Sequence, residues 1–510
     1  MWSLGWWPHA ILHGQNPIVT HAIWAPEGRN LAWATSVPTL SLAAAPLTLA
    51  GGPTLAYNLL AIAIPALSAW TAFLLCRHVT RSFLPSLLGG YLFGFSSYMF
   101  AHSVGHMNLT AVFLVPLVAL VLLSFVEGSL TARGLVVRLG VLLALQIGIS
   151  TEVTLTLTLS IAVALLVAVA AAPAARRRVR SLLLPLAGAY GVAALLTLPF
   201  VAYALLDFEP GSINQPRDYP ADLLNIVVPA RLTWIGWGWT QGVSGAFLGN
   251  VSENGAYLGL PCLVILVWFA LLYRKRASAR FLLVALAIGV VAELGTSLHI
   301  RGRSSIPLPW APLSHVPPFN NVLPVRLSMF VALAAAVAVA WWAASSAVPR
   351  AARLVLPAAA VASIFPALWS GVWHEHPARA AFFSAGLYRA CLQPDDRLLL
   401  LPFQFWGSSM LWQAEAGYDF QMADGFISPK APKLPDARGA FLLLNNLQRG
   451  SWRPLIRLAN DLGVTMIVVE GGHGDSWRNF LAPVTKPTDI GGVSLYSLRP
   501  GGRSPCTAGA

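Results

Sequence analysis

Long apolar runs repeat along this 510-residue chain up to about residue 371. A helix needs about 20 mainly apolar residues to cross a bilayer, and ten segments approach that pattern. They are 54–75, 82–101, 109–126, 134–150, 152–172, 181–206, 256–273, 281–296, 327–347 and 353–371. The sequence therefore predicts an α-helical polytopic membrane protein with about ten transmembrane helices.

The composition of the chain agrees with this prediction. Hydrophobic residues make up 56% of the sequence and charged residues 10%, whereas soluble domains carry about 25% charged residues. The net charge of +13 would suggest nucleic acid as a partner, but the basic residues gather in short loops such as 176–180 and 274–280. Loops rich in Lys and Arg that alternate with poorly basic loops follow the positive-inside rule. The charge therefore indicates orientation, and we expect no nucleic-acid partner.

The same rule predicts which parts of the chain lie outside the plasma membrane. It divides the chain into an extracytoplasmic loop with juxtamembrane helices (1–53), a transmembrane core (54–371) and an extracytoplasmic domain (372–510). Within the first part, the apolar stretch 37–49 is too short to span and is expected to be interfacial or re-entrant.

The last part, 372–510, predicts a small α/β fold. Apolar runs at 397–402 and 464–470 are typical of strands, and 452–462 has a helical pattern. Cys391 and Cys506 flank this part and could pair if it is exported. Two further cysteines, Cys76 and Cys262, lie in or at the ends of spans and are expected to be free.

The first thirty residues, MWSLGWWPHAILHGQNPIVTHAIWAPEGRN, lack a charged flank followed by a clean apolar run. They predict neither a signal peptide nor a spanning helix. Tryptophans instead alternate with polar side chains, namely His9, His13, Glu27, Arg29 and Asn30. Tryptophan favours the headgroup level of a membrane, so we expect the polar side chains to face a site at the outer surface, shared with His106 and Arg326.

Polar residues at the outer ends of the spans are further candidates, because a bilayer penalises polar groups. His102 and His106 are four residues apart, on one helical face if the helix continues, and Asn108 follows them. They could hydrogen-bond a phosphate or sugar hydroxyls, or they could be interfacial histidines solvated by water. Two histidines at this spacing can bind zinc, but no nearby Cys or Glu completes a ligand set. A divalent cation is left open, and no metal ligand is assigned.

Glu152 and Arg326 complete the candidates. Glu152 lies in the hairpin Ser-Thr-Glu at 150–152, where it could act as a base or cap the following helix. Arg326 begins the ninth span, where a guanidinium suits a lipid phosphate or can snorkel to the interface. No Walker, Rossmann or nucleophile-elbow motif occurs in the sequence.

These features combine into a recognisable layout. An aromatic outer segment precedes a half-helix that ends in Gly-Gly-Pro, then come the block YLFGFSSYMFAHSVGHMNLTAVFLVPL, the late span PVRLSMFVALAAA and the α/β tail. This layout resembles the GT-C superfamily of polytopic glycosyltransferases, in particular the YfhO-like and protein-mannosyltransferase-like bacterial membrane proteins. The resemblance covers nearly the whole chain, through short blocks.

The resemblance implies a sugar donor linked to polyprenyl phosphate. The sugar would be a hexose or pentose, transferred with inversion to a cell-envelope glycan, lipid or protein on the outer face. A carboxylate would serve as general base, and basic or amide groups would hold the carrier phosphate. The candidate catalytic residues are Glu27 and Glu152. The candidate substrate-binding residues are His9, His13, Arg29, Asn30, His102, His106, Asn108 and Arg326.

The chain departs from the family at one point. The family's base is usually an Asp after a first spanning helix, ahead of the aromatic segment, and neither occurs here. Either Met1 is not the biological start and a helix with its Asp precedes it, which we favour, or the chain is a shortened or inactive homologue that uses Glu27 instead. The alternatives to a glycosyltransferase are a flippase or transporter of lipid-linked precursors, or a truncated, non-catalytic, membrane-anchored homologue that binds envelope glycan. A transporter predicts mid-bilayer charge pairs and a paired-half layout, and the sequence shows neither.

Overall fold

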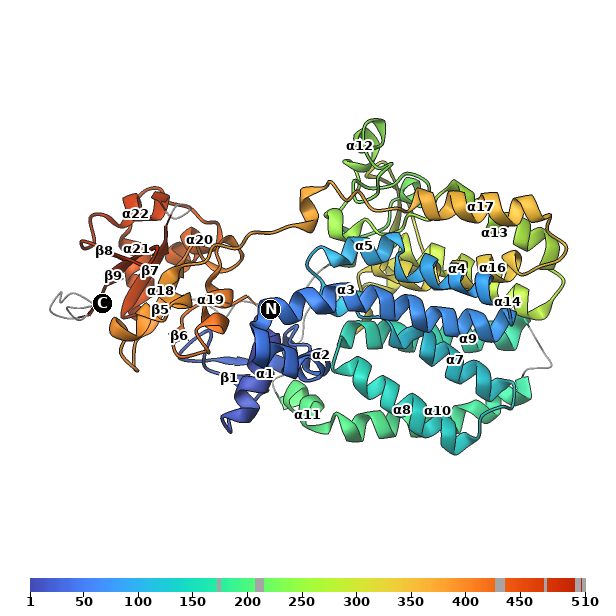
Figure 1. Cartoon of the computed structure of the whole chain (residues 1–510), viewed down its shortest axis with the longest axis horizontal. Coiled ribbons are helices and arrows are strands. Elements are labelled where there is room, and N and C mark those ends of the chain that lie inside the picture. Colours follow the sequence, from blue (N-terminus) through green and yellow to red (C-terminus); the bar gives the residue numbers. More distant parts are fainter. Residues whose placement is uncertain (172–175, 207–214, 427–435, 472–474, 500–505, 507–510) are drawn as a thin grey trace. The chain divides into compact units, whose positions relative to one another are not determined.

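The computed structural model describes residues 1–171, 176–206, 215–426, 436–471, 475–499 and 506. Two compact units make up the chain (Figure 1). The first unit comprises residues 1–58, 199–209 and 375–510. The second unit comprises residues 59–198 and 210–374.

Helices dominate the second unit. Those of ten or more residues are α3 (Ala45–Thr80, which starts in the first unit), α4 (Phe83–Gly94), α7 (Leu114–Val126), α8 (Ala132–Ile147), α9 (Thr151–Ala171), α10 (Arg176–Leu196), α13 (Leu260–Tyr273), α14 (Ala277–Glu293), α16 (Ser328–Ala343) and α17 (Arg350–Ser363). Each of the ten predicted segments overlaps one of them. Among the described residues, five stretches are long and apolar enough to cross a membrane: Ala45–Thr80, Met107–Val126, Thr151–Ala170, Arg176–Leu196 and Pro324–Ala343.

At least three predicted spans are interrupted, and one of them, 109–126, is divided between α6 (Met107–Thr110) and α7. The segment 82–101 is divided between α4 and α5 (Ser97–Ser103), because Ser96 leaves the helical conformation and its Oγ accepts a hydrogen bond from the Met99 N–H at 3.3 Å. The segment 181–206 is divided between α10 and α11 (Leu198–Leu206). Pro199 stands in the first turn of α11, where a missing N–H costs least.

The stretch 37–49, which is predicted to be interfacial or re-entrant, is divided between two helices. It forms α2 (Pro38–Ala43) and the beginning of α3. Helix α3 then bends at Gly52, whose φ of 80° is left-handed and favours glycine.

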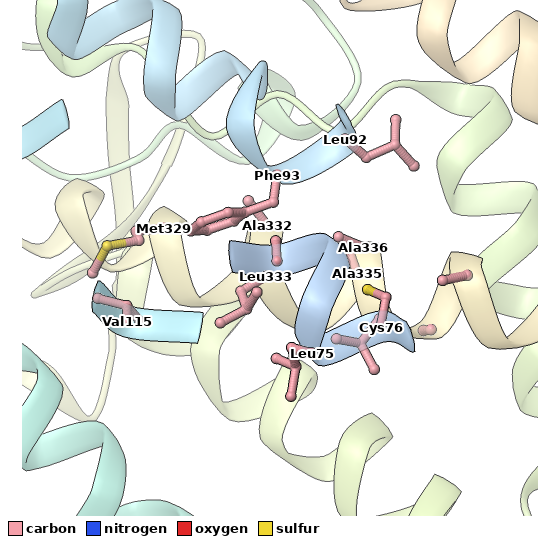
Figure 2. Close-up of a cluster of buried hydrophobic side chains, with 14 of the residues drawn as sticks. Leu75, Cys76, Leu92, Phe93, Val115, Met329, Ala332, Leu333, Ala335 and Ala336 are labelled. Atoms are coloured by element: carbon pink, nitrogen blue, oxygen red, sulfur yellow. The ribbon is translucent and has the colours of Figure 1, made fainter. Parts of the chain in front are cut away.

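The core of the second unit forms around α16. In α16 and the turn before it, 72% of the residues in the most apolar 18-residue stretch are buried. The corresponding share in the other four long stretches is 28% to 44%. Helix α4 packs closely on α16 and on α3, because a Cβ at Gly89 would lie 2.6 Å from Cys76 Sγ and 3.0 Å from the Ala336 carbonyl oxygen. Figure 2 shows side chains of these helices meeting, with Phe93 from α4 beside Ala332 and Leu333. Small residues thus permit the close helix approach that membrane bundles use.

The first unit contains a five-stranded sheet. Its strand order is β6 (Gln421–Met422), β5 (Arg397–Leu401), β7 (Met466–Glu470), β9 (Val493–Ser497) and β8 (Thr488–Ile490). Strands β6, β5 and β7 are parallel, whereas β9 and β8 are antiparallel to their neighbours. The accompanying helices are α18 (Ala381–Ser384), α19 (Ser409–Glu415), α20 (Ala437–Leu444), α21 (Arg453–Asp461) and α22 (Asp475–Leu481). Elements β5, β7 and α21 lie where the sequence predicts them.

The N-terminal segment shares the core of this sheet, although the sequence analysis treats 1–53 and 372–510 as separate parts. The segment consists of α1 (Trp2–Leu12), the hairpin β1 (Val19–Thr20) and β2 (Arg29–Asn30), and the turns after it. Trp2 Nε1 donates to Gln413 Oε1 at 2.7 Å, and Gln413 Nε2 donates to the Ala22 carbonyl at 2.6 Å. Ala22 O also accepts from the Met422 N–H at 2.9 Å, so the segment is hydrogen-bonded to the edge strand β6.

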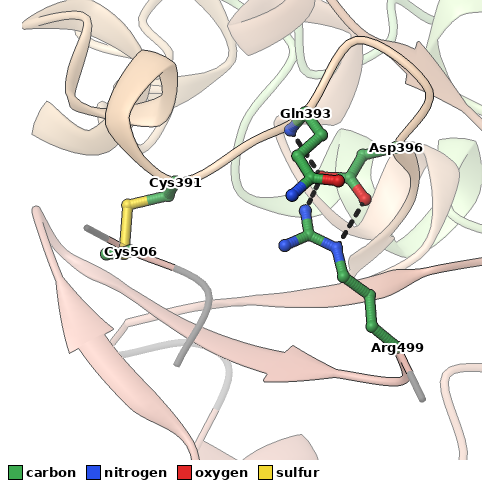
Figure 3. Close-up of a disulfide and its surroundings, with 5 residues drawn as sticks. All are labelled: Cys391, Gln393, Asp396, Arg499 and Cys506. Carbon is green, nitrogen blue, oxygen red and sulfur yellow. Dashed lines mark hydrogen bonds and ion pairs between the residues drawn. A yellow bond between two sulfur atoms is a disulfide. The ribbon is translucent and has the colours of Figure 1, made fainter. Parts of the chain in front are cut away.

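A disulfide joins Cys391 to Cys506, 115 residues further along the chain (Figure 3). Beside it, Arg499 Nε donates to Asp396 Oδ1 at 2.9 Å, and Asp396 Oδ2 accepts from the Gln393 N–H at 2.7 Å. These contacts hold the end of β9 against the segment that leads into β5. Cys76 and Cys262 are buried and free, as predicted.

Candidate functional site

Three charged residues from separate segments meet in the second unit. Arg326 Nε donates to both carboxylate oxygens of Glu253, at 3.2 and 3.1 Å, and its Nη2 also donates to Glu253 Oε1. Arg326 Nη1 donates to Glu152 Oε2 at 2.5 Å. The side chain of Glu253 is 2% exposed and that of Arg326 13%, whereas that of Glu152 is 24% exposed. Glu152 is thus the member of this cluster that solvent reaches most easily.

His102 lies on the far side of Glu253. Its Nδ1 is 3.0 Å from the Tyr98 carbonyl oxygen, which accepts a hydrogen bond from that nitrogen. The other ring nitrogen, Nε2, then points toward Glu253 Oε2 at 3.5 Å. His102 is fully buried, and Tyr98 packs against its ring at 4.2 Å. The helix carbonyl therefore fixes how the imidazole faces the carboxylate.

Short turns place the charged side chains. Glu253 ends the 3₁₀ turn Val251–Glu253, whose first N–H groups are satisfied by Asn250, since its side chain accepts from the Ser252 N–H at 2.9 Å. Gly255 lets this loop approach α5, because a Cβ there would lie 2.9 Å from Tyr98 Cα. Arg326 lies in the 3₁₀ turn Pro324–Leu327, which leads directly into α16.

The two interpretations of Glu152 can be compared with this geometry. Glu152 stands in the first turn of α9, where an acid can cap a helix. The capping contact is made by Ser150, whose Oγ accepts a hydrogen bond from the Val153 N–H at 3.3 Å. The Glu152 carboxylate instead binds Arg326, and its Oε1 is buried without a hydrogen-bond partner among the described residues. Arg326 likewise is paired and mostly buried rather than extended toward solvent.

His106 lies beside this cluster, and Asn108 follows it two residues later in the chain. The His106 ring is 6.1 Å from that of His102, and its Nδ1 is buried without a described partner. Burial, and then the neighbouring His102, lower the pKa of His106 to about 4. His106 is therefore neutral near pH 7 and can exchange a hydrogen bond with a ligand. Asn108 is half-buried in the short helix α6 (Met107–Thr110).

Glu253 was not among the candidates from the sequence. Burial acts to raise its pKa, but interactions with His102 and Arg326 together lower the pKa to about 2. Its position offers one signal, since this acid stands a few residues before an apolar span, as Arg326 does. No group of three or more His, Cys, Asp or Glu side chains with a metal-binding arrangement occurs in the part of the chain that the structure describes.

The remaining candidates belong to the first unit, and their described contacts are within it. The His9 ring packs on His13 at 4.2 Å and on Tyr418 at 4.7 Å. Asn30 caps the turn Leu31–Trp33 and donates to the Tyr203 carbonyl at 2.8 Å. Glu27 is exposed and Arg29 half-buried. The shared outer cavity with His106 and Arg326 stays a prediction.

Residues 4–313 match the sequence model of a family described as "Domain of unknown function (DUF6311)". No curated protein matches the chain significantly. The family match covers more than half of the chain and includes His102, His106, Asn108, Glu152 and Glu253, whereas Arg326 lies beyond its end.

Solved structures show the fold. The apo oligosaccharyltransferase of Archaeoglobus fulgidus is similar, with a TM-score of 0.55 and 12% identity over 92% of this chain and 65% of that chain. The same organism's enzyme, tethered through a disulfide bond to an acceptor peptide containing the NVT sequon, is also similar. Its TM-score is 0.52 and its sequence identity 12%, over 92% of this chain and 64% of that chain. The complex of this organism's enzyme with an inhibitory peptide and a dolichol-phosphate has a TM-score of 0.50 and a sequence identity of 12%, over 98% of this chain and 70% of that chain. The chain thus has the GT-C-like fold and spans slightly less than two thirds of the first of these enzymes.

Proposed function

The chain belongs to the DUF6311 family, and we propose that it is a membrane glycosyltransferase of the GT-C type. The observation that carries this proposal is the buried cluster of Glu152, Glu253 and Arg326 in a chain with the fold of an oligosaccharyltransferase. A carboxylate that a guanidinium holds by one oxygen, with its other oxygen unpartnered among the described residues, is suited to proton transfer. Buried carboxylates with no such role are seldom retained in a membrane protein.

Glu152 is the proposed general base. Its Oε2 is held by Arg326, while its Oε1 has no hydrogen-bond partner among the described residues. In the proposed step an acceptor hydroxyl or amide gives its proton to Glu152 as it attacks the anomeric carbon of the sugar. The bond from that carbon to the carrier phosphate breaks, with inversion, and the phosphate leaves with the electron pair. General-base assistance is worth typically 10²–10⁴-fold in rate.

Arg326 and His102 are proposed as positioning residues. The sequence suggested that Arg326 meets the donor phosphate, but its Nε, Nη1 and Nη2 already donate to carboxylates. We therefore propose that Arg326 fixes the positions of the Glu152 and Glu253 carboxylates relative to each other, and that His102 orients Glu253. His106 and Asn108 are the proposed contacts to the donor. His106 lies beside His102, and its buried Nδ1 has no partner among the described residues. Asn108 is half-buried two residues further along the chain.

The proposed donor is a hexose or pentose on a polyprenyl phosphate. A dolichol-phosphate is bound in one structural neighbour, and an acceptor peptide is tethered in another. The proposed acceptor is a cell-envelope glycan, lipid or protein on the extracytoplasmic side of the plasma membrane. The Cys391–Cys506 disulfide supports export of the C-terminal part, since disulfides persist in oxidising compartments.

Turnover of polyprenyl-phosphate sugars by the purified full chain in nanodiscs tests the proposal. We expect the wild-type protein to release the carrier phosphate when an envelope extract supplies the acceptor. Glu152→Gln should lower turnover at least 100-fold with little change in the KM of the donor. The matched control is Glu127→Gln, which removes an exposed acid that pairs with His78 at 2.6 Å and should keep full turnover. Full turnover in Glu152→Gln, or no turnover of any donor by the wild type, would refute the proposal.

A further inference from the structure

A basic surface pocket lies in the C-terminal part of the first unit, apart from the residues discussed so far. Its volume is about 450 Å³, within the range of small-molecule sites. The lining residues come from α20, α21 and the turn before α21: Arg438, Ser451, Trp452, Arg453, Pro454, Ile456 and Arg457. Three guanidinium groups therefore surround one small cavity.

The arginines of this pocket are available to a ligand. All three are exposed, and among the described residues neither Arg438 nor Arg453 has a side-chain hydrogen bond or ion pair. Arg457 approaches Asp436 only at 3.6 Å, with 67% of its side chain exposed. Other arginines of the same domain differ, because Arg499 binds Asp396 and Arg397 donates to the Leu462 carbonyl. Among the described residues, Arg438 and Arg453 thus have no side-chain partner that would explain their convergence, whereas Arg457 has a long ion pair with Asp436.

The helices that line this pocket, α20 and α21, belong to the connection between β6 and β7. The end of α21 contacts the beginning of β5, through Arg397 and the Leu462 carbonyl, so α21 begins near the opposite, carboxyl edge of the parallel strands. The chain leaves β5 for β6 on one side and later returns to β7 on the other side.

We propose that this pocket binds the phosphoryl group of a phosphorylated sugar. Guanidinium groups bind phosphate oxygens through paired N–H donors, and three of them can neutralise a dianion. Trp452 offers an aromatic ring for the sugar. The Ser451 Oγ accepts a weak hydrogen bond of 3.3 Å from the Arg453 N–H, which leaves its own proton free for a ligand oxygen. The volume fits one sugar ring with its phosphate.

Isothermal titration calorimetry tests this assignment by measuring the binding of small molecules to the full-length protein in detergent. The probes are glucose 1-phosphate, inorganic phosphate and glucose. We expect saturable binding of glucose 1-phosphate, at least tenfold weaker binding of inorganic phosphate, and no binding of glucose. The double variant Arg438→Ala with Arg453→Ala should bind glucose 1-phosphate at least tenfold more weakly. Raising the salt concentration should weaken the binding of glucose 1-phosphate to the wild-type protein.

The matched control is Arg449→Ala, since Arg449 is an exposed arginine of the same domain outside the pocket. It should bind as the wild type does. Equal weakening by the control would show a general charge effect and overturn the proposal, as would the absence of saturable binding. Equal affinities for glucose 1-phosphate and inorganic phosphate would overturn the assignment to a sugar. These outcomes are independent of glycosyl transfer, because the readout is binding.

Discussion

Arg326 Nη1 lies 2.5 Å from Glu152 Oε2, although the two residues are 174 positions apart in the sequence. The same guanidinium binds Glu253 through its other nitrogens. One cation therefore fixes the loop before α13, the first turn of α9 and the start of α16 at a single point. Stability and the proposed chemistry consequently depend on the same group.

Replacing Arg326 should destabilise the second unit. In Arg326→Ala two carboxylates lose their common partner, and an uncompensated buried charge costs about 3–5 kcal/mol. Arg326→Lys should lose less, since it keeps the charge but not the fork of donors. Chemical unfolding of the purified protein in detergent measures both. Arg217→Ala is the control, because the Arg217–Asp218 pair is exposed and should change stability by under about 0.5 kcal/mol. Equal effects of the alanine variants at 326 and 217 would contradict this ranking.

Acidification should destabilise the wild-type protein through Glu253. Its pKa is lowered to about 2 in the folded protein from an ordinary value of 4.5. A lowered carboxyl pKa stabilises the folded state above pH 4.5, and this contribution is lost as the pH falls from about 4.5 to 2. The contribution amounts to roughly 3 kcal/mol. Unfolding free energies measured across this range should fall less steeply in Glu253→Gln, which is less stable than the wild type at pH 7. Identical pH profiles would show that Glu253 is not held as an anion.

A large side chain at Gly89 should disrupt the helix packing around α16. A Cβ at this position already meets Cys76 and Ala336 within 3.0 Å, and overpacking a core costs typically 1–3 kcal/mol or more. Gly191→Leu provides the control in α10, since a Cβ there has no atom within 4 Å. Size-exclusion chromatography and the melting temperature should show Gly89→Leu aggregated or strongly destabilised and Gly191→Leu unchanged. Normal melting of both variants would mean that α4 does not pack as described.

The disulfide should stabilise the first unit. It closes a loop of 115 residues, for which chain-entropy arguments give about 3–5 kcal/mol. Reductant should lower the melting temperature of the wild type, whereas Cys391→Ala with Cys506→Ala should start lower and not respond to reductant. A response of the double variant equal to that of the wild type would assign the effect to some other group.

The sequence predicted the helical membrane core because long apolar runs leave few alternatives to helices in a bilayer. It also placed β5, β7 and α21, whose patterns are local. It did not predict the breaks at Ser96 and Pro199, because hydropathy averages over such single residues. Of the candidate residues, Glu152, His102 and Arg326 lie together in the structure.

Long-range pairing explains what the sequence analysis missed. Glu253 stands in a loop with several other acids, and only its contact with Arg326 distinguishes it. The N-terminal tryptophans gave a pattern typical of a membrane interface, but Trp2 and Trp6 lie in the core of the sheet domain. A pattern of residue types cannot show which distant surface buries it.

The hydrogen bond between Trp2 and Gln413 joins residues 411 positions apart. Since ribosomes add about 5–20 residues per second, roughly 20–80 s pass between the synthesis of the two partners. During that time the N-terminal tryptophans have no sheet to cover them, while the helices of the second unit are being made. The N-terminal segment is therefore made first but gains its packing partners last. An early pause or truncation in synthesis would leave it as an exposed aromatic surface that chaperones or proteases can recognise.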